Sequence, residues 1–127
     1  DETWRGDLAW CAEQSNDFLP VVFPGFSWHN LKGDAPLNQI PRRKGAFLWS
    51  QFVAAKEVGA KMIYVAMFDE VDEGTAIFKC TNDPPTGNGV PFIDYEGLPS
   101  DHYLRLTGLG ARLLRGEISP SKVEIAQ

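Results

Sequence analysis

The chain has 127 residues, of which 43% are hydrophobic and 12% aromatic, and its formal net charge at pH 7 is −5. This composition is typical of a folded globular domain rather than of a disordered chain. The basic residues are scattered apart from a short cluster at Arg42, Arg43 and Lys44, which argues against a nucleic-acid-binding surface. The apolar stretches are far shorter than the roughly 20 residues of a membrane-spanning helix, so we expect no membrane span.

Helical and extended patterns alternate from the start of the chain. Residues 7–14 carry apolar side chains at helical spacing and indicate the last turns of a helix. Residues 18–26 form a continuous apolar run, which predicts a strand buried on both faces, although two prolines limit its hydrogen-bonded part to a short stretch. Residues 27–43 are a long polar loop with aromatic content, and loops of this length in a compact domain are commonly functional or disordered.

The alternation continues in the second half of the chain. Residues 45–58 place apolar side chains on one stripe and predict a helix that is closed by Gly59. Residues 61–68 predict a second strand buried on both faces, which leads directly into the acidic segment 69–75.

The remaining elements complete a βα pattern. Residues 90–95 are a candidate short strand, and a leucine-rich helix opens at residues 99–101 and ends at Gly116. This order predicts an α/β fold with parallel strands and crossover helices. By pattern alone it fits either part of a barrel or part of an open doubly wound sheet.

Two cysteines, Cys11 and Cys80, form no CxxC pair and fit neither a disulfide-rich scaffold nor a zinc site. We expect two buried or half-buried thiols and leave their pairing open. In the leading interpretation we expect no cofactor and no bound metal.

The segment after the second predicted strand places four carboxylates within five residues: Asp69, Glu70, Asp72 and Glu73. So dense a charge beside an apolar strand is unusual without a functional role, and active sites of α/β folds lie at this end of the strands. A turn at Gly74 would bring the carboxyls of Glu70 and Glu73 to one side. Two carboxyl groups, one protonated and one ionised, are the minimum apparatus for cleaving a glycosidic bond.

Aromatic and polar residues near these acids support a sugar-binding site. Trp28, His29 and Asn30 follow the first predicted strand, where an indole face can contact sugar C–H groups and the polar side chains can bind hydroxyls. Trp49 lies on the buried stripe of the predicted helix, so we interpret it mainly as a core residue.

Three other interpretations of the acidic segment stay open. The acids would cap a helix N-terminus or be solvated on a loop. They would belong to a non-catalytic carbohydrate-binding domain. Alternatively, they would supply oxygen ligands to Ca²⁺ or Mg²⁺, although their spacing does not match the EF-hand pattern.

Three blocks of the chain resemble the last third of the bacterial proteins grouped as glycoside hydrolase family 71 and 99-like. These blocks are VVFPGFSWHN at residues 21–30, IYVAMFDEVDEGTAIFK at 63–79 and LPSDHYLRLTGLGARLLRGE at 98–117. In the endo-α-mannosidases of family 99, a strand-end segment NEWHEGT carries both catalytic glutamates, and DEVDEGT at residues 69–75 aligns with it without a gap.

The resemblance implies a role for each acidic residue. Glu70 is the base that assists the neighbouring sugar 2-hydroxyl, and Glu73 protonates the leaving oxygen and later activates water. The family's Trp-His between the two glutamates is Val71-Asp72 here, and its Asn is Asp69. We expect the substrate-binding residues to be Trp28, His29, Asn30, Asp69 and Asp72.

The resemblance also implies an architecture. A complete (β/α)8 barrel has roughly 250 residues, so we expect residues 1–127 to be a single domain, a fragment that forms the C-terminal portion of a TIM barrel with about the last three β/α units. An exposed sheet edge would associate with the missing N-terminal part of the barrel or with a second copy.

The expected function follows from the same resemblance. It is that of a retaining glycoside hydrolase acting on an α-linked oligosaccharide or polysaccharide, with no cofactor. We expect the chain alone to bind and cleave sugars weakly, because most strands of the barrel are outside it. Members of the group are often secreted or periplasmic in bacteria, and this is the only ground for an extracellular or periplasmic location.

Overall fold

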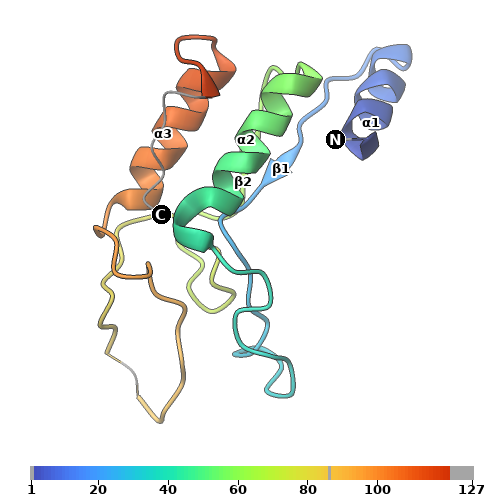
Figure 1. Ribbon diagram of the computed structural model, residues 1–127. Coiled ribbons are helices and arrows are strands. Elements are labelled where there is room, and N and C mark those ends of the chain that lie inside the picture. The colour runs from blue at the N-terminus through green and yellow to red at the C-terminus, as the bar shows by residue number, and fades with distance from the viewer. Residues whose placement is uncertain (1, 86, 121–127) are drawn as a thin grey trace.

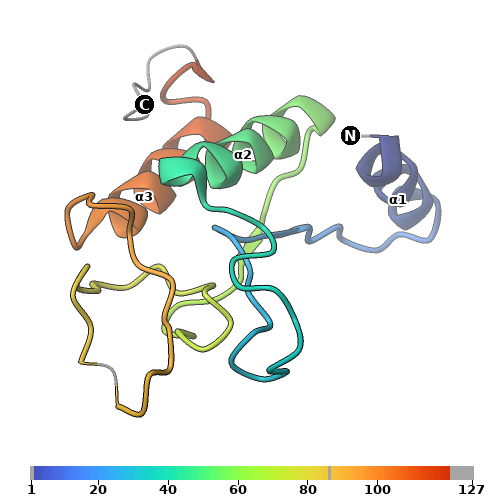
Figure 2. The ribbon, with the colours of Figure 1, turned by 60° about the horizontal axis from the view of Figure 1, so that its bottom comes forward.

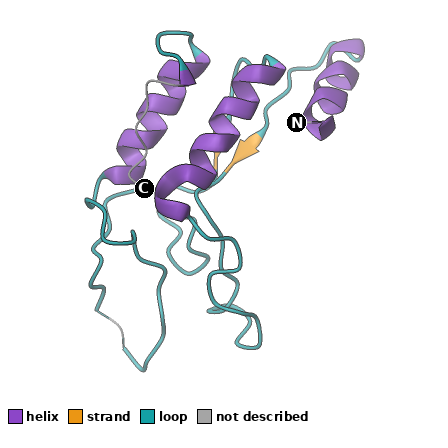
Figure 3. Ribbon diagram, in the orientation of Figure 1, coloured by secondary structure: helices purple, strands orange, loops and turns teal. Residues whose placement is uncertain are grey.

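The computed structural model describes residues 2–85 and 87–120. Figure 3 shows that helices supply most of the regular structure, that the strands are short and that long loops connect them. In chain order the elements are α1 (Glu2–Glu13), β1 (Val21–Val22), the 3₁₀ turn η1 (Arg43–Gly45), α2 (Ala46–Val58), β2 (Tyr64–Val65) and α3 (His102–Leu114).

The two strands pair in parallel, with Val21 opposite Tyr64 and Val22 opposite Val65. The chain passes from β1 to β2 through α2, so the three elements form a βαβ unit. Strand pairing extends one step beyond β1 at its start, where the N–H of Tyr64 donates to the carbonyl of Pro20 at 2.9 Å. The prediction of parallel neighbours joined by a helix is confirmed, as is the short length of the first strand.

The prediction that both strands are buried on both faces is wrong. Val22 is fully buried, whereas Val21 is 50% and Tyr64 46% exposed. Successive side chains of a strand point to opposite faces, so one face of this small sheet packs on the helices and the other is open. Leu19 and Met62, two residues before Val21 and Tyr64, are also exposed. We call the row Leu19, Val21, Met62 and Tyr64 the open face.

Helices α2 and α3 lie side by side and run in the direction opposite to the strands (Figure 1). Their contact is close at Gly110, where an added Cβ would lie 2.5 Å from ring atoms of the fully buried Phe52. Trp49 is 7% exposed and belongs to this core, as expected. The buried core residues are Val22, Leu48, Trp49, Phe52, Ile77, Tyr95, Tyr103, Leu106 and Leu113.

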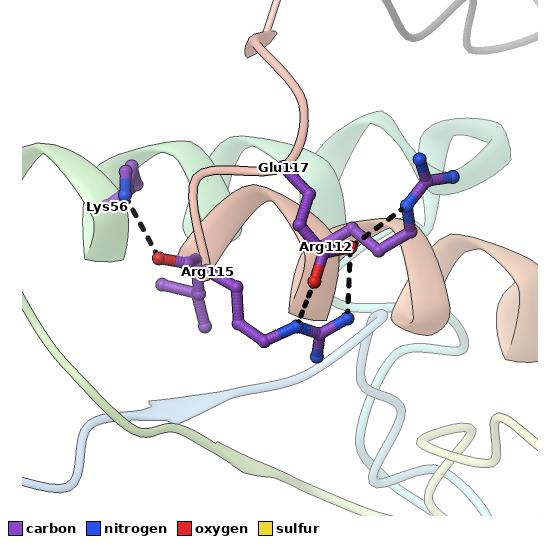
Figure 4. Close-up of polar contacts among 5 residues, drawn as sticks. Lys56, Arg112, Arg115 and Glu117 are labelled. Carbon is purple, nitrogen blue, oxygen red and sulfur yellow. Dashed lines mark hydrogen bonds and ion pairs between the residues drawn. The ribbon is translucent and has the colours of Figure 1, made fainter.

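The ends of α2 and α3 follow local signals in the sequence. Gly59 closes α2 in the left-handed conformation with a φ of 83°, and Gly116 follows α3 with a φ of 76°. At the end of α3, the Nζ of Lys56 on α2 donates to the carbonyl of Leu114 at 2.9 Å, which ties the two helices together (Figure 4).

A small ion-pair group follows α3. The carboxylate of Glu117 accepts hydrogen bonds from Arg112 and Arg115 (Figure 4). The hydrogen bond from Arg115 lowers the pKa of the Glu117 carboxyl and raises the pKa of the Arg115 guanidinium. Both side chains are well exposed, so this group contributes little to stability.

Three loops gather at the end of the sheet toward which the strands point, and α2 and α3 start from that same end (Figures 1 and 2). The first of these loops follows β1, the second follows β2 and the third precedes α3. Helix α1 lies on the outer side of α2, where Trp4 packs against the core, and none of its described residues is fully buried.

The candidate strand at residues 90–95 is absent, and this segment pairs with neither described strand. The N–H of Tyr95 donates to Oδ1 of Asn82 at 2.9 Å, and the carbonyl of Pro91 accepts from Nδ2 of Asn30 at 2.9 Å. Proline also has no N–H to contribute to a strand ladder.

Over residues 2–85 and 87–120, no helix combines the length and the apolar character needed to cross a membrane.

Candidate functional site

Residues 67–78, which follow β2, fold back on themselves, and we call them the acidic loop. At its base, the N–H of Met67 donates to the carbonyl of Thr75 at 3.1 Å. The N–H groups of Ile77 and Phe78 both donate to the carbonyl of Phe68, at 3.0 and 2.9 Å. These bonds hold the outgoing and returning halves together, so the tip of the loop has a fixed base.

The tip of the acidic loop is a tight turn at Gly74. The N–H of Thr75 donates to the carbonyl of Glu70 and the N–H of Gly74 to the carbonyl of Val71, both at 3.1 Å. Gly74 has a φ of 65°, in the left-handed region that glycine adopts most readily. The predicted turn at Gly74 is therefore present.

The four acidic side chains of the tip differ in environment. Glu70 and Glu73 are partly buried, whereas Asp69 and Asp72 are exposed. Oε1 of Glu70 accepts a 3.0 Å hydrogen bond from the N–H of Asp72, which fixes the orientation of that carboxylate. The carboxyl of Glu73 has no hydrogen-bond or ion-pair partner among the described residues.

The loop after β1 lies against the acidic loop. The N–H of Ser27 donates to the carbonyl of Glu73 at 2.7 Å, and Ser27 is 1% exposed. Oγ of Ser27 in turn accepts from the N–H of Asn38 at 3.0 Å, which folds the rest of the loop over. This arrangement brings the segment that contains Trp28 and His29 beside the tip that contains Glu73.

Trp28 is 39% exposed and offers part of its indole face to solvent. Its ring centroid lies 5.7 Å from that of Phe26, and the Nζ of Lys32 lies 4.1 Å from the Trp28 ring centroid. Phe26 and Lys32 therefore hold the ring in place, and the Lys32 ammonium lies over one of its faces.

His29 and Asn30 are both fixed through one side of their side chains. Nδ1 of His29 lies 2.7 Å from the carbonyl of Ala35, and because a carbonyl only accepts, Nδ1 carries a proton. Asn30 donates from Nδ2 to Pro91, while its buried Oδ1 has no partner within the described residues. Asn30 thus links the loop after β1 to the loop before α3.

Sequence reasoning missed Arg42, which supports the acidic loop from below. In the sequence Arg42 stands out only as part of the short basic cluster at residues 42–44, whereas the structure buries it to 1% exposure. Its Nη2 donates to the carbonyls of Gly74 and Ala76 at 2.9 and 2.8 Å. No sequence signal distinguishes Arg42 from its neighbour Arg43, because the groups that receive it are 32 and 34 residues further along the chain.

Two buried tyrosines complete this support. The hydroxyl of Tyr95 donates to the carbonyls of Ala76, at 3.2 Å, and Phe78. The guanidinium carbon of Arg42 lies 4.4 Å from the ring centroid of Tyr103 and 4.9 Å from that of Tyr95. Burial raises the pKa of Tyr95, and burial raises the pKa of Tyr103 to about 12, so both rings stay neutral at ordinary pH.

The acidic loop does not resemble a metal centre. In the part of the chain that the structure describes, no group of three or more His, Cys, Asp or Glu side chains is placed to hold a metal ion. Cys11 and Cys80 are free and partly buried, as expected.

Comparisons with known proteins point in one direction. No protein-family profile matches the chain. It is 27% identical over 106 residues to the glycoprotein endo-alpha-1,2-mannosidase-like protein of Danio rerio, a match that covers 84% of this chain and 24% of that protein. Its fold matches the family 99 endo-alpha-mannosidase of Bacteroides thetaiotaomicron with a TM-score of 0.81 and 25% identity, covering 93% of this chain and 34% of that one.

A second structure of the bacterial enzyme, in complex with bis-tris-propane, gives a TM-score of 0.80 at 25% identity over 91% of this chain and 35% of that one. The resemblance to family 99 is confirmed, and the fold is a portion of a (β/α)8 barrel, as predicted. The relatives are glycoside hydrolases. The chain spans 24% of the curated relative and about a third of the solved enzyme.

Proposed function

We propose that this chain carries the catalytic loop of a retaining glycoside hydrolase that cleaves α-linked mannosides, with Glu70 and Glu73 as the catalytic pair. The observation that supports this most directly is the position of the acidic loop. It lies at the carboxyl end of a parallel strand, and the Ser27 to Glu73 hydrogen bond joins it to the Trp28 segment. The α-mannoside preference rests on the printed names of the relatives.

The environments of the two glutamates suit different tasks. The carboxylate of Glu70 is oriented by the Asp72 N–H and stays an acceptor, as a base that draws the proton from a sugar 2-hydroxyl must be. The carboxyl of Glu73 has no partner among the described residues, so it is available to protonate the leaving oxygen. In the first step, the deprotonated 2-oxygen bonds to the anomeric carbon and displaces the leaving oxygen. In the second step, water attacks the anomeric carbon and gives its proton to Glu73, while the bond to the 2-oxygen breaks and Glu70 returns its proton to that oxygen. Two successive displacements at the anomeric carbon retain its configuration.

The neighbouring side chains would bind the sugar. The indole of Trp28, a residue that is 39% exposed, is suited to contact with sugar C–H groups. The ring of His29 makes its hydrogen bond through Nδ1, and Nε2 has no partner among the described residues. The carboxylates of Asp69 and Asp72, which are exposed residues, would accept hydrogen bonds from hydroxyls. Asn30 would contribute by holding the loop after β1 to the loop before α3, since its Oδ1 is shielded from solvent.

The open face indicates how the site is completed. Four apolar side chains, Leu19, Val21, Met62 and Tyr64, are 41% to 50% exposed on one side of the sheet. In a barrel this side faces the interior, where side chains from other strands would cover it. We infer that residues 1–127 act as one part of a larger barrel and that the chain alone is weakly active, because the sugar ring is held from several strand ends. An extracellular or periplasmic location is proposed from the resemblance alone.

The test is turnover of α-linked mannoside oligosaccharides by the longest natural protein that contains this chain. We expect Glu73→Gln and Glu70→Gln each to lower kcat by on the order of 10²- to 10⁴-fold without unfolding the protein. Glu57→Gln is the matched control, since Glu57 is exposed on α2 and outside the three loops. Product analysis by NMR should show retained anomeric configuration.

The same assay separates the alternative. A protein that binds the oligosaccharide but shows no turnover, with binding unaffected by Glu73→Gln, is a non-catalytic carbohydrate-binding domain. Full activity in both glutamine variants would place the catalytic residues elsewhere.

A further inference from the structure

We propose that Arg42 is a positioning residue for Glu73, acting through the backbone of the acidic loop. This inference rests on the proposed function. It assigns a specific task to a buried cation that contacts no acidic side chain of the loop.

Two anchors hold the consecutive peptide groups on either side of Gly74, and the first of these groups begins at Glu73. The carbonyl of Glu73 accepts from the Ser27 N–H at 2.7 Å, and the next carbonyl, that of Gly74, accepts from Nη2 of Arg42 at 2.9 Å. The same Nη2 also reaches the carbonyl of Ala76 at 2.8 Å. The first of these peptide groups is one of the two that meet at the Cα of Glu73, so the anchors restrict the direction in which the Glu73 side chain leaves the backbone.

The guanidinium is itself held from several sides. It stacks near the rings of Tyr95 and Tyr103, and Tyr95 also donates its hydroxyl proton to the Ala76 carbonyl. The aliphatic stem of Arg42 lies against Gly25, where an added Cβ would approach Cγ of Arg42 to 2.8 Å. Arg42 therefore has little freedom to move, and the carbonyls that it binds have little freedom either.

The cost of burying Arg42 argues that it does more than fill space. A buried charge loses its hydration, and no ion pair with a carboxylate compensates it among the described residues. Nε and Nη1 have no hydrogen-bond partner there. An apolar side chain would fill the same volume at lower cost. An apolar side chain could not donate hydrogen bonds to two backbone carbonyls. A planar guanidinium does so in a fixed geometry, and a lysine ammonium does so less well.

The test compares Arg42→Lys with Arg43→Met in the longest natural protein that contains this chain. Arg43 is the exposed neighbour and serves as the matched control for a change in the basic cluster. We expect Arg42→Lys to lower kcat by on the order of 10- to 100-fold with KM within about twofold, because a misplaced catalytic group slows the chemical step. Arg43→Met should keep both constants. A rise in KM at unchanged kcat would overturn the inference.

A second measurement does not depend on activity. Hydrogen exchange of the Ser27 and Thr75 amides reports the two bonds that frame the tip of the loop. In Arg42→Lys we expect these two amides to exchange at least about tenfold faster, while the amide of Phe52 in α2 keeps its rate. An equal acceleration at all three amides, or none at Ser27 and Thr75, would show that Arg42 does not position the loop.

The two measurements separate the possible failures. If the unmodified protein has no glycosidase activity, the proposed function fails, and the exchange data still decide whether Arg42 fixes the loop. If the unmodified protein is active and Arg42→Lys is equally active, the inference fails and the proposed function stands.

Discussion

The N–H of Ser27 donates a 2.7 Å hydrogen bond to the carbonyl of Glu73. Ser27 is 1% exposed, so water does not compete for this bond. It joins the loop that follows β1 to the loop that follows β2. Its consequence is that an aromatic segment and an acidic turn, far apart in the chain, form one surface at the end of the strands.

The two tryptophans at this end of the molecule should respond differently to truncation. Trp28→Ala should raise KM for α-mannosides and change the free energy of unfolding by less than about 1 kcal/mol, because the ring is 39% exposed. Trp49→Ala should cost about 3 to 5 kcal/mol, because Trp49 is 7% exposed in the core. Urea unfolding and steady-state kinetics measure both effects. A large loss of stability in Trp28→Ala would make Trp28 a core residue.

The turn at Gly74 should be intolerant of a side chain. Gly74→Ala places a Cβ at a φ of 65° and 3.0 Å from Cγ1 of Ile93, so we expect a loss of about 1 to 3 kcal/mol. Gly33→Ala is the matched control, because no atom lies within 4 Å of its added Cβ, and its effect should stay within about 0.5 kcal/mol. Chemical denaturation of both variants checks this. Equal stabilities would mean that the turn has another conformation.

The helices were predictable because their signals are local. The predicted helix at residues 45–58 is found at Ala46–Val58, and its predicted end at Gly59 is a left-handed cap. The leucine-rich helix is found at His102–Leu114, and Gly116 follows it with a positive φ. In both cases the apolar spacing lies within the helix and the glycine lies one or two residues after its end.

The parts that the sequence did not predict depend on residues distant in the chain. An apolar run such as residues 61–68 does not reveal whether both of its faces are covered, and Tyr64 is exposed. Arg42 is buried because two tyrosines more than 50 positions further along the sequence surround it, and nothing near Arg42 indicates them. The acidic turn was located correctly from DEVDEGT, but the hydrogen bonds from Arg42 to the backbone of the acidic loop were not predicted.

The burial of Tyr103 should make the free energy of unfolding depend on pH in the alkaline range. Burial raises the pKa of Tyr103 to about 12, whereas the same group titrates near 10 in the unfolded chain. The unfolded state therefore loses its proton first. The contribution of the protonated Tyr103 to the free energy of unfolding is fully present below about pH 10 and is lost as pH rises through about 12.

Tyr103→Phe isolates this contribution. The Tyr103 hydroxyl has no hydrogen-bond partner in the described protein, so phenylalanine should fit with little change in stability at neutral pH. Between pH 10 and 12, the melting temperature of the variant should fall less steeply than that of the unmodified protein. Parallel curves over this window would show that Tyr103 is not shielded from solvent.

The contact between α2 and α3 can be tested with two glycines of one helix. Gly110→Ala would place a Cβ 2.5 Å from ring atoms of Phe52, and Phe52 is fully buried and cannot move aside. We expect a loss of about 1 to 3 kcal/mol from overpacking. Gly108→Ala, where no atom lies within 4 Å of the added Cβ, should instead gain about 0.5 to 1 kcal/mol from the higher helix propensity of alanine. Urea midpoints should therefore shift in opposite directions. If Gly110→Ala also stabilises the protein, the two helices do not pack at Phe52 as described.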